Sequence, residues 1–478
     1  MISIKARCLL FLIAACLGVS GYARKDKPNF VFIFADDQGY NDLGCFGSPD
    51  IKTPRIDQLA RDGMKFTNFY AQTICGPSRT ALMTGCYPMR VGELDNFKNI
   101  HPIPHPKEIL LPQLLKASGY TNGCIGKWDL ARHNPELTYP ELSPTYRGFD
   151  YWFGVASSND GGHPPYFRNG KRIGEDADMN SVTHRYTEEA LEFIRKHQDT
   201  PFFLYLAHTM PHTILGASEA FRGKSKRGLY GDVIEELDWS TGQVLDLLKE
   251  LGLQEDTYVV YTSDNGPWWL RQEHGGSAYP LRSGKVSTWD GGPRVPCIMY
   301  APRRIPAGSI CERVTTTMDI LPTFVALAGG KLPSDRVIDG RDISRLLHGE
   351  GGWDVAEKPY YYYLWTHLQA VRYGDWKLVL PRPSRPKWLG HLVTTDHINP
   401  EDMPQIESPR LYNLRYDIGE QDDWSNMYPD VVGRLMKLAE DARQDLGDYN
   451  EIGTGQRQYY EDKPLQPITR NLTDYGKP

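Results

Sequence analysis

The sequence predicts an α/β fold, with a large domain followed by a smaller antiparallel α+β domain. The chain has 478 residues, which is too long for one small core and suits one large domain plus a smaller one. Continuous apolar runs, typical of strands buried on both faces of a parallel sheet, alternate with amphipathic segments typical of helices. A Gly-rich stretch at residues 349–359 then precedes a region of short strands and one helix.

The composition indicates a globular protein and excludes one broad class of partner. Charged residues make up 24% of the chain and hydrophobic residues 40%, which is typical of globular rather than disordered proteins. The formal net charge of −6 argues against a nucleic-acid-binding protein. If the substrate is an anion, a local basic pocket must therefore overcome the overall sign.

Residues 1–23 have the pattern of a signal peptide. Lys5 and Arg7 form a charged region before the apolar run Leu9–Val19, which is too short to span a bilayer. Small residues follow at the expected cleavage positions. We therefore expect a secreted or periplasmic protein with no transmembrane span. As an alternative, Cys16 ends a short sequence similar to a bacterial lipoprotein box, so the chain could be lipid-anchored there.

Two predicted strands each end in acidic or amide side chains. The apolar run Asn29–Ala35 leads to Asp36 and Asp37, and the run Thr257–Thr262 leads through Ser263 to Asp264 and Asn265. Because parallel strands end at the same edge of a sheet, these groups should meet there. Three carboxylates and an amide oxygen suit Ca²⁺, with Mg²⁺ second. The alternative is that Asp36 and Asp37 only cap a helix.

The stretch Thr73–Gly85 predicts a short helix with a cysteine at its start. Pro77 fits the first turn, and Gly85 is a natural stop. Cys75 would lie just before the N-terminus, where free N–H groups favour an anion, and Arg79 could point back at that anion from one turn further on. This placement predicts an electropositive, reactive cysteine rather than a buried or disulfide-bonded one.

The run Cys75-Gly76-Pro77-Ser78-Arg79 resembles the signature of the type I, formylglycine-dependent sulfatases, of the arylsulfatase and N-acetylgalactosamine-sulfatase type. The resemblance implies an alkaline-phosphatase-like α/β/α sandwich with a smaller C-terminal α+β domain. It also implies that a formylglycine-generating or other maturation enzyme oxidises Cys75 to formylglycine. By the same resemblance, the metal is Ca²⁺, and its ligands are Asp36, Asp37, Cys75, Asp264 and Asn265.

The next family-like motif follows a predicted strand. Pro54–Met64 and Leu111–Ser118 predict amphipathic helices, and Tyr120–Ile125 predicts a strand that leads to Gly126-Lys127-Trp128-Asp129. The family has Gly-Lys-Trp-His here, so the resemblance implies that Lys127 binds the sulfate. Taken alone, Lys127 would be interpreted as a solvated lysine.

Asp129 is where the chain departs from the family pattern. In the family, the histidine at this place is the base that expels sulfate, and a carboxylate can also accept that proton. Asp129 is therefore predicted to be this base. In the alternative interpretation, Asp129 only pairs with Lys127 or Arg132, and His133 is the base.

Three more site residues come from later motifs. The resemblance places Ser158 in the substrate pocket, after the aromatic run Gly148–Gly154. The helix Thr187–His197 and the strand Pro201–Ala207 precede His212, which matches the family's catalytic histidine; the competing His208 is interpreted as structural. The long helix Asp232–Leu251 follows, Lys285 matches the catalytic lysine, and Asp319–Phe324 begins another family-like helix.

The last part of the chain predicts the smaller domain. A hairpin is expected around Gly374-Asp375, a strand at Leu411–Leu414 and a helix at Asp430–Gly447. Residues 455–478 are polar and predict a wrapping tail, and Asn471-Leu472-Thr473 is a glycosylation sequon if the source is eukaryotic. The predicted organisation is therefore a signal peptide (1–23), a catalytic domain (24–352), and a C-terminal α+β domain with its tail (353–478).

The cysteines give no disulfide pattern. Cys8 and Cys16 lie in the signal region, and a modified Cys75 would leave five others, which cannot all pair. The sequence does not decide which of them do. The five are Cys45, Cys86, Cys124, Cys297 and Cys311.

Together these motifs predict hydrolysis of a sulfate ester on a sulfated carbohydrate or an aryl sulfate. The resemblance implies attack on sulfur by a hydroxyl of the hydrated aldehyde at position 75, which Arg79 orients. Lys127 and Lys285 clamp the sulfate beside Ca²⁺, and His212 with Lys285 helps to protonate the leaving oxygen.

Two basic stretches, Arg222–Arg227 and Arg382–Trp388, predict contacts with a sulfated polymer; each could also be a solvated loop. Two other classes of protein stay open. One is a phosphohydrolase of the same fold, and the other is a sulfated-glycan-binding relative without activity.

Overall fold

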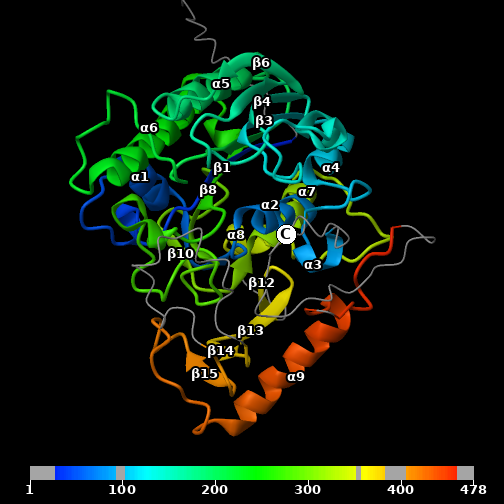
Figure 1. The fold of residues 1–478 in the computed structure, drawn as a ribbon. Coiled ribbons are helices and arrows are strands. Elements are labelled where there is room, and N and C mark those ends of the chain that lie inside the picture. Colours follow the sequence, from blue (N-terminus) through cyan, green and yellow to red (C-terminus); the bar gives the residue numbers. More distant parts are fainter. Residues whose placement is uncertain (1–26, 93–102, 351–356, 383–404, 450, 460–478) are drawn as a thin grey trace, which may run out of the picture.

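The computed structural model describes residues 27–92, 103–350, 357–382, 405–449 and 451–459. Figure 1 shows a large α/β domain, coloured from blue to yellow-green, and a smaller unit in yellow, orange and red beside it. The large domain contains an 11-stranded sheet and the small one a 4-stranded sheet. The predicted fold class, a mixed α/β core with a separate small antiparallel sheet, is confirmed.

The centre of the large sheet is parallel, as the apolar runs predict. Its strand order is β10-β2-β9-β8-β1-β7-β3-β4-β5-β6, with β11 paired to β2. The consecutive strands from β8 to β4 are parallel, whereas β9, β5 and β6 are antiparallel to their neighbours. The strands are β1 Asn29–Ala35, β2 Met64–Tyr70, β3 Thr121–Lys127, β4 Tyr151–Val155, β5 Pro165–Arg168, β6 Lys171–Asp176, β7 Phe202–Ala207, β8 Thr257–Ser263, β9 Arg294–Tyr300, β10 Ser309–Cys311 and β11 Thr315–Thr316.

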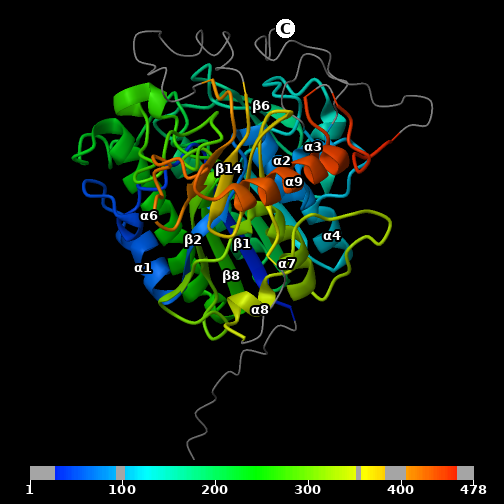
Figure 2. The same ribbon diagram turned by 90° about the horizontal axis from the view of Figure 1, so that it is seen from below.

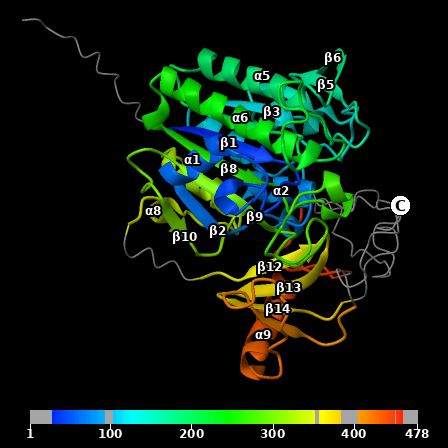
Figure 3. The same cartoon turned by 90° about the vertical axis from the view of Figure 1, so that its left-hand side faces the viewer.

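Helices cover both faces of this sheet, because the central strands present apolar side chains to both sides. Phe30, Phe32 and Phe34 of β1 face a core with α2, α4 and α7, whereas Val31 and Ile33 face α1, α5 and α6. Figure 3 shows α5 and α6 stacked on one side of the strands and the small domain on the other side of the molecule. The helices are α1 Pro54–Asp62, α2 Cys75–Thr84, α3 Pro88–Val91, α4 Leu111–Ala117, α5 Val182–Lys196, α6 Gly228–Glu250, α7 Ile320–Leu327, α8 Ser344–Leu347 and α9 Pro429–Leu446.

Some predicted boundaries differ from the structure. The helix expected at Pro54–Met64 ends at Asp62, because Gly63 takes an extended conformation and Met64 begins β2. Strand β3 continues to Lys127, so this lysine is the last residue of a buried strand.

The small domain packs one helix on a four-stranded sheet. Strands β12 Tyr360–Leu364, β13 His367–Tyr373, β14 Trp376–Val379 and β15 Arg410–Asn413 are antiparallel neighbours. The predicted hairpin is present between β13 and β14, with Gly374 at a φ of 62° in its turn. Figure 2 shows α9 lying across this sheet near β14, and its Leu435, Ala439 and Ala442 pack against it.

Asp290 of the large domain joins the two domains through a buried ion cluster. Its carboxylate accepts hydrogen bonds from Tyr362 at 2.7 Å and from Lys377 at 3.1 Å, both in the small domain. Lys377 also lies 2.6 Å from Glu420. The predicted boundary at residues 352 and 353 and the signal segment lie outside the described residues.

Part of the predicted tail is described. Tyr459 stacks on His105 of the large domain with ring centroids 3.7 Å apart, and its hydroxyl donates to Glu108 at 2.6 Å. No helix among the described residues combines the length and the apolar character that crossing a membrane requires.

Candidate active site

The carboxyl ends of β1 and β8 form the floor of the site. Ala35 pairs with Ser263 in parallel register, so Asp36 and Asp264 leave the sheet side by side. The chain turns at Asp37, whose φ is 65°, and its N–H donates to Asp264 Oδ1 at 3.1 Å. All three carboxylates are buried, and the strand ends therefore bring them together as the sequence predicts.

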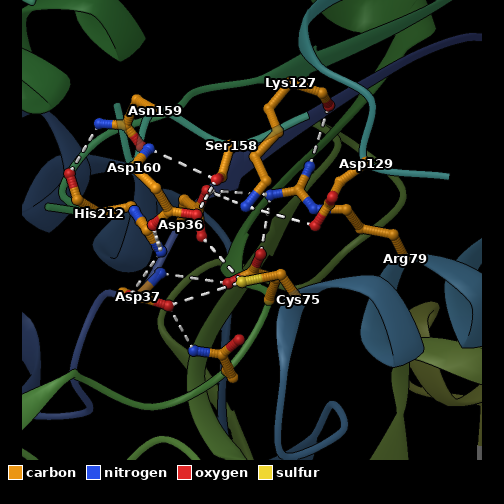
Figure 4. A network of polar contacts seen from close by, with 12 residues as sticks. Asp36, Asp37, Cys75, Arg79, Lys127, Asp129, Ser158, Asn159, Asp160 and His212 are labelled. Carbon is orange, nitrogen blue, oxygen red and sulfur yellow. Dashed lines mark hydrogen bonds and ion pairs between the residues drawn. The ribbon is translucent and has the colours of Figure 1, made fainter. Parts of the chain in front are cut away.

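Helix α2 delivers Cys75 to these carboxylates (Figure 4). The helix begins at Cys75, one residue earlier than predicted, and the Cys75 Sγ lies 3.3 Å from Asp36 Oδ1 and 3.8 Å from Asp37 Oδ1. Gly85, with a φ of 67°, ends the helix as predicted.

The sequence predicts an electropositive environment that would lower the pKa of Cys75. The structure contradicts this prediction for the thiol. Burial, followed by the charges of Asp264 and Asp36, raises its pKa well above the usual range, despite Lys127 and Lys285 nearby. Burial is the largest cause, so Cys75 is a buried residue and not the more exposed, reactive cysteine that the sequence predicts.

Arg79 is fully buried and connects the floor to β3. Its guanidinium donates to Asp264 Oδ2 at 2.7 Å, and to the Lys127 carbonyl at 3.0 Å and the Tyr205 hydroxyl at 3.2 Å. It also lies 3.6 Å from Asp36 and stacks over the ring of Phe34. These contacts direct Arg79 mainly to the carboxylates and to β3.

Two buried lysines each pair with one carboxylate. Lys127 Nζ lies 2.7 Å from Asp36 Oδ2, and Lys285 Nζ lies 2.8 Å from Asp37 Oδ1. Burial alone would raise the pKa of Asp36, but Lys127 and the other nearby cations hold this pKa well below its usual range. Asp36 is therefore ionised, and both lysines face the same pocket as Cys75.

His212 presents one ring nitrogen to this pocket. Its Nδ1 lies 2.6 Å from the Thr213 carbonyl, which requires a proton on Nδ1 and leaves Nε2 facing Asp37 at 3.6 Å. Burial and then the charge of Lys285 lower its pKa. The competing His208 lies 3.4 Å from Ser240 of α6, and burial lowers its pKa to about 3, which fits the structural role expected for it.

Ser158 lines the pocket, and its neighbours fix the opposite wall. The Ser158 hydroxyl donates to Asp160 Oδ2, and Asp160 Oδ1 lies 3.7 Å from His212 Nε2. Asn159 donates to the His212 carbonyl at 3.0 Å and to the Ile214 carbonyl at 2.9 Å. Sequence reasoning gave Asp160 no role, although this residue ends the family-like run Ser157–Asp160 from which Ser158 was chosen.

Asp129 lies beside Lys127, as the alternative interpretation expected, and also pairs with His133, which that interpretation had named only as the base. Its Oδ1 lies 2.7 Å from His133 Nδ1 and its Oδ2 lies 3.5 Å from Lys127 Nζ. Burial opposes ionisation, but Lys127 and His133 hold the pKa of Asp129 well below its usual range.

The residues present fit a hard cation. Asp36, Asp37, Cys75 and His212 offer ligand atoms that all lie within 4.8 Å of one another. Asn265 donates to Asp37 Oδ1 at 2.7 Å, while its own Oδ1 is buried and accepts no hydrogen bond from the residues that the structure describes. Buried acceptor oxygens beside carboxylates are the donor set that Ca²⁺ prefers.

The pocket above this floor has a volume of about 580 Å³. It is large enough for part of a substrate beyond a sulfate group, and Trp268, Trp365 and Arg271 contribute to its outer wall. The predicted residues that line it are Cys75, Lys127, Asp129, Ser158, His212 and Lys285.

All six cysteines among the described residues are unpaired, Cys75 included. The sequence left open which cysteines form disulfide bonds, and in the structure none of these six does.

Comparisons with known proteins agree with the geometry. The family model described as Sulfatase matches residues 28–330, and that of the C-terminal region of aryl-sulfatase matches residues 356–474. The N-acetylgalactosamine-6-sulfatase of Rattus norvegicus is 35% identical over 93% of this chain and 91% of its own length. The steryl-sulfatase of Homo sapiens is 34% identical over 73% of this chain and 74% of its own length. A solved structure from Bacteroides thetaiotaomicron, described with the metabolism of multiple glycosaminoglycans, has a TM-score of 0.75 at 27% identity, over 87% of this chain and 99% of its own.

Proposed function

The chain belongs to the sulfatase family and is a sulfuric ester hydrolase, and we propose that it acts on sulfated carbohydrates through a formylglycine at position 75 and a bound Ca²⁺. The observation that best supports this is the position of Cys75, at the start of α2 and 3.3 Å from Asp36. There the thiol sulfur stands in for the oxygens of a hydrated aldehyde. The curated relatives named as sulfatases favour this activity over the phosphohydrolase and over the relative without activity.

Asp36, Asp37, Asp264 and Asn265 would hold the metal, together with residue 75. When present, Ca²⁺ neutralises sulfate oxygens and formylglycine supplies a hydroxyl as nucleophile. Lys127 and Lys285 each reach one of these carboxylates and face the pocket, so they can also donate to sulfate oxygens.

His212 is the proposed proton donor to the leaving oxygen. The Thr213 carbonyl fixes its Nδ1 proton, so the Nε2 face is the one that can exchange a proton with a substrate in the pocket. Lys285 lies on the same side of the pocket and would assist by stabilising negative charge on that oxygen. Ser158, through its hydroxyl and its bond to Asp160, would contact the substrate at the opposite wall.

Asp129 was predicted to be the base that expels sulfate. Its carboxylate has a pKa well below the usual range and a cationic partner at each oxygen, which makes it a poor proton acceptor near neutral pH. We therefore propose that Asp129 orients Lys127 and stays ionised during turnover. Arg79, buried between Asp264 and β3, would hold the floor in place beside the residue-75 hydrate.

A carbohydrate substrate is supported by the relatives and by one basic loop. The rat relative is named for N-acetylgalactosamine 6-sulfate, and the bacterial structure is described with glycosaminoglycans. In the predicted stretch Arg222–Arg227, the Asp232 carboxylate accepts three backbone N–H groups and fixes the loop. Arg227 donates to the Gly275 carbonyl at 3.1 Å, just after the segment that places Arg271 in the pocket wall.

The second basic stretch gives less support. Arg382 is buried and donates to Gln369 Oε1 at 2.7 Å, so its predicted role as an exposed contact is wrong. The rest of that stretch, with the signal peptide, Cys16 and the sequon, lies outside the described residues. Secretion, lipid anchoring and the maturation enzyme therefore remain predictions.

The experiment that tests this proposal combines mass spectrometry and kinetics. The chain is expressed with a formylglycine-generating enzyme, and the peptide that contains residue 75 is weighed. We expect an aldehyde, turnover of sulfated monosaccharides and oligosaccharides, and complete loss of activity in Cys75→Ala with little loss of stability. Turnover by a protein with only unmodified thiol would refute the proposed nucleophile. Turnover of steryl or aryl sulfates alone would refute the proposed substrate.

A further inference from the structure

The loop after β3 is bent so that His133 returns to Asp129. Asp129, Arg132 and His133 have φ angles of 57°, 59° and 49°, a left-handed conformation that side chains other than glycine rarely adopt. Such backbone persists only where the surrounding contacts hold it. Here the contact is the hydrogen bond of 2.7 Å between His133 Nδ1 and Asp129 Oδ1.

The other ring nitrogen of His133 faces the opposite wall of the pocket. His133 Nε2 lies 3.4 Å from Asp160 Oδ2, so a carboxylate stands at each nitrogen. A ring that donates from both nitrogens must be an imidazolium. The Asp129 charge raises the pKa of His133 to about 10, which agrees with a cation at neutral pH.

These contacts form a chain along the pocket wall, in which cations and carboxylates alternate from Lys127 to Asp160. From Lys127 the contacts run through Asp129 and His133 to Asp160, and from there to His212. Figure 4 shows Asp129 and Asp160 on different sides of the group, with Asp160 beside His212. The side chains of His133 and Asp160 are 46% and 53% exposed, whereas Lys127 is fully buried. His133 and Asp160 therefore lie at the mouth of the pocket.

We propose that His133 is a positioning residue for sulfate-ester hydrolysis, which bridges Asp129 and Asp160 and compensates both carboxylates so that an anionic substrate can enter. The proposal rests on the proposed function, because it needs a substrate with negative charge. Without the bridge, two carboxylates in the pocket wall would repel the sulfate, and Asp160 would lose one of the contacts that hold it beside His212.

The test is a double-mutant cycle between positions 129 and 133. His133→Gln removes the charge, and we expect KM for a sulfated monosaccharide to rise about tenfold with kcat changed by less than about twofold. In the Asp129→Asn background, the same substitution should raise KM less, by about threefold, because only the Asp160 charge is left for His133 to compensate. His133→Arg, which keeps a cation, should restore most of the affinity.

His184→Gln is the matched control. His184 is 49% exposed and lies 3.5 Å from Glu188, but it belongs to α5 and not to the pocket wall. It should leave KM unchanged. An unchanged KM in His133→Gln, or an equal rise in both backgrounds, would overturn the proposal.

The charge of His133 also has a direct readout that needs no substrate. The charged groups that face it are Asp129, Asp160 and Lys127. Nitrogen-15 NMR of the imidazole in the free enzyme should show both ring nitrogens protonated at pH 8, and a neutral ring there would refute the bridge. If the enzyme hydrolyses no sulfate ester, the proposed function fails, while this spectrum still tests the bridge.

The pH dependence of KM gives a second check on activity. KM of the wild type should rise as the pH passes about 10, where His133 loses its proton, and His133→Arg should lack this rise. An identical rise in both proteins would assign it to another group and count against His133.

Discussion

At the scale of single residues, each buried carboxylate of the floor already has a buried cation. Asp36 pairs with Lys127, Asp37 with Lys285, and Asp264 with Arg79. This pairing holds the pKa of Asp36 well below its usual range, whereas burial and the charge of Asp36 raise the pKa of Asp264 to about 7 despite Arg79. Removing one partner should therefore affect folding as well as catalysis.

Asp264→Ala tests this coupling. The change leaves the guanidinium of Arg79 without its contact of 2.7 Å in the interior. Breaking a buried pair in this way should cost about 3–5 kcal/mol of unfolding free energy. We expect a lower Tm, loss of turnover and loss of stoichiometric Ca²⁺, measured by calorimetry and elemental analysis. Asp264→Asn, which keeps the shape, should lose the metal with a smaller loss of Tm. Stoichiometric Zn²⁺ in the active enzyme would contradict the proposed metal.

The bridge at His133 should appear in the pH dependence of stability. Its pKa rises from 6.5 to about 10 on folding, so the bridge contributes fully below pH 6.5 and is lost as the pH rises through 10. The difference in Tm between the wild type and His133→Gln should therefore be greatest near pH 6 and vanish near pH 10.5. A difference that grows toward high pH would contradict this sign. The His184→Gln control should show no such dependence across this range.

At the scale of elements, strand ends position the functional groups. Lys127 is placed by Gly126, which has a φ of 107° and lies so close to β7 that an added Cβ would stand 1.8 Å from the Ala207 carbonyl. No side chain fits between these paired strands. The glycine before the lysine is therefore required by packing as well as by its positive φ.

Gly126→Ala should separate β3 from β7 and displace Lys127. We expect a loss of unfolding free energy of about 3 kcal/mol or more, with kcat/KM reduced at least about tenfold. Gly119→Ala is the matched control, because Gly119 also has a positive φ of 86° but an added Cβ there meets nothing within 4 Å. It should cost only about 1 kcal/mol, with normal kinetics. Urea denaturation and initial rates measure both. Equal losses of unfolding free energy in the two variants would mean that backbone strain causes the loss in Gly126→Ala, and not the clash with β7.

The elements that sequence patterns predict well are those with a simple burial pattern. Strands β1, β7 and β8 are buried along their whole length, and their apolar runs give both ends within a residue. Strand β6 was missed, because its side chains are mostly exposed and show no alternation. Strand β2 was not predicted, and the predicted helix ran on to Met64, because only Gly63 separates α1 from β2.

At the scale of the whole molecule, buried charges join the two domains. Lys377 of β14 is fully buried between Asp290 of the large domain and Glu420. Its removal would leave Glu420 without this buried cation, and Asp290 with only Arg294 and Arg372 near it. Arg382, which sequence analysis expected at the surface, is buried in the same region and donates to Gln369.

Lys377→Met should therefore destabilise the joined molecule by about 3–5 kcal/mol and expose the small domain to limited proteolysis. Lys437→Met on α9 is the control, since Lys437 is 77% exposed and pairs with Asp441 at 3.2 Å. Exposed pairs contribute about 0–1 kcal/mol, so this variant should resemble the wild type. Similar Tm values for the two variants would show that the junction does not depend on the ion cluster.

The anchored basic loop predicts how the molecule holds a polymer. Charge reversal in Lys224→Glu with Lys226→Glu should raise KM for sulfated oligosaccharides about tenfold and leave KM for a small aryl sulfate nearly unchanged. Charge reversal at Lys437, an exposed residue of α9 in the small domain, is the control. Equal effects on both substrates would reject a polymer-binding role for the loop.

The sequence by itself determined the family, the fold class and the residues of the floor. The reason is that Asp36, Asp264 and Lys127 follow apolar strands whose ends must share one edge of a sheet, and that Cys75 begins a helix with clear start and stop signals. Local pattern and strand topology were enough to bring these groups together.

Only the tertiary structure decided which charges meet across loops. His133 and Asp160 belong to different loops without periodicity, and Asp290 and Lys377 belong to different domains. It also decided the state of Cys75, whose pKa depends on how closely Asp36 and Asp264 approach and on how completely water is excluded. Such interactions depend on distance and burial in three dimensions, and no spacing along the chain encodes them.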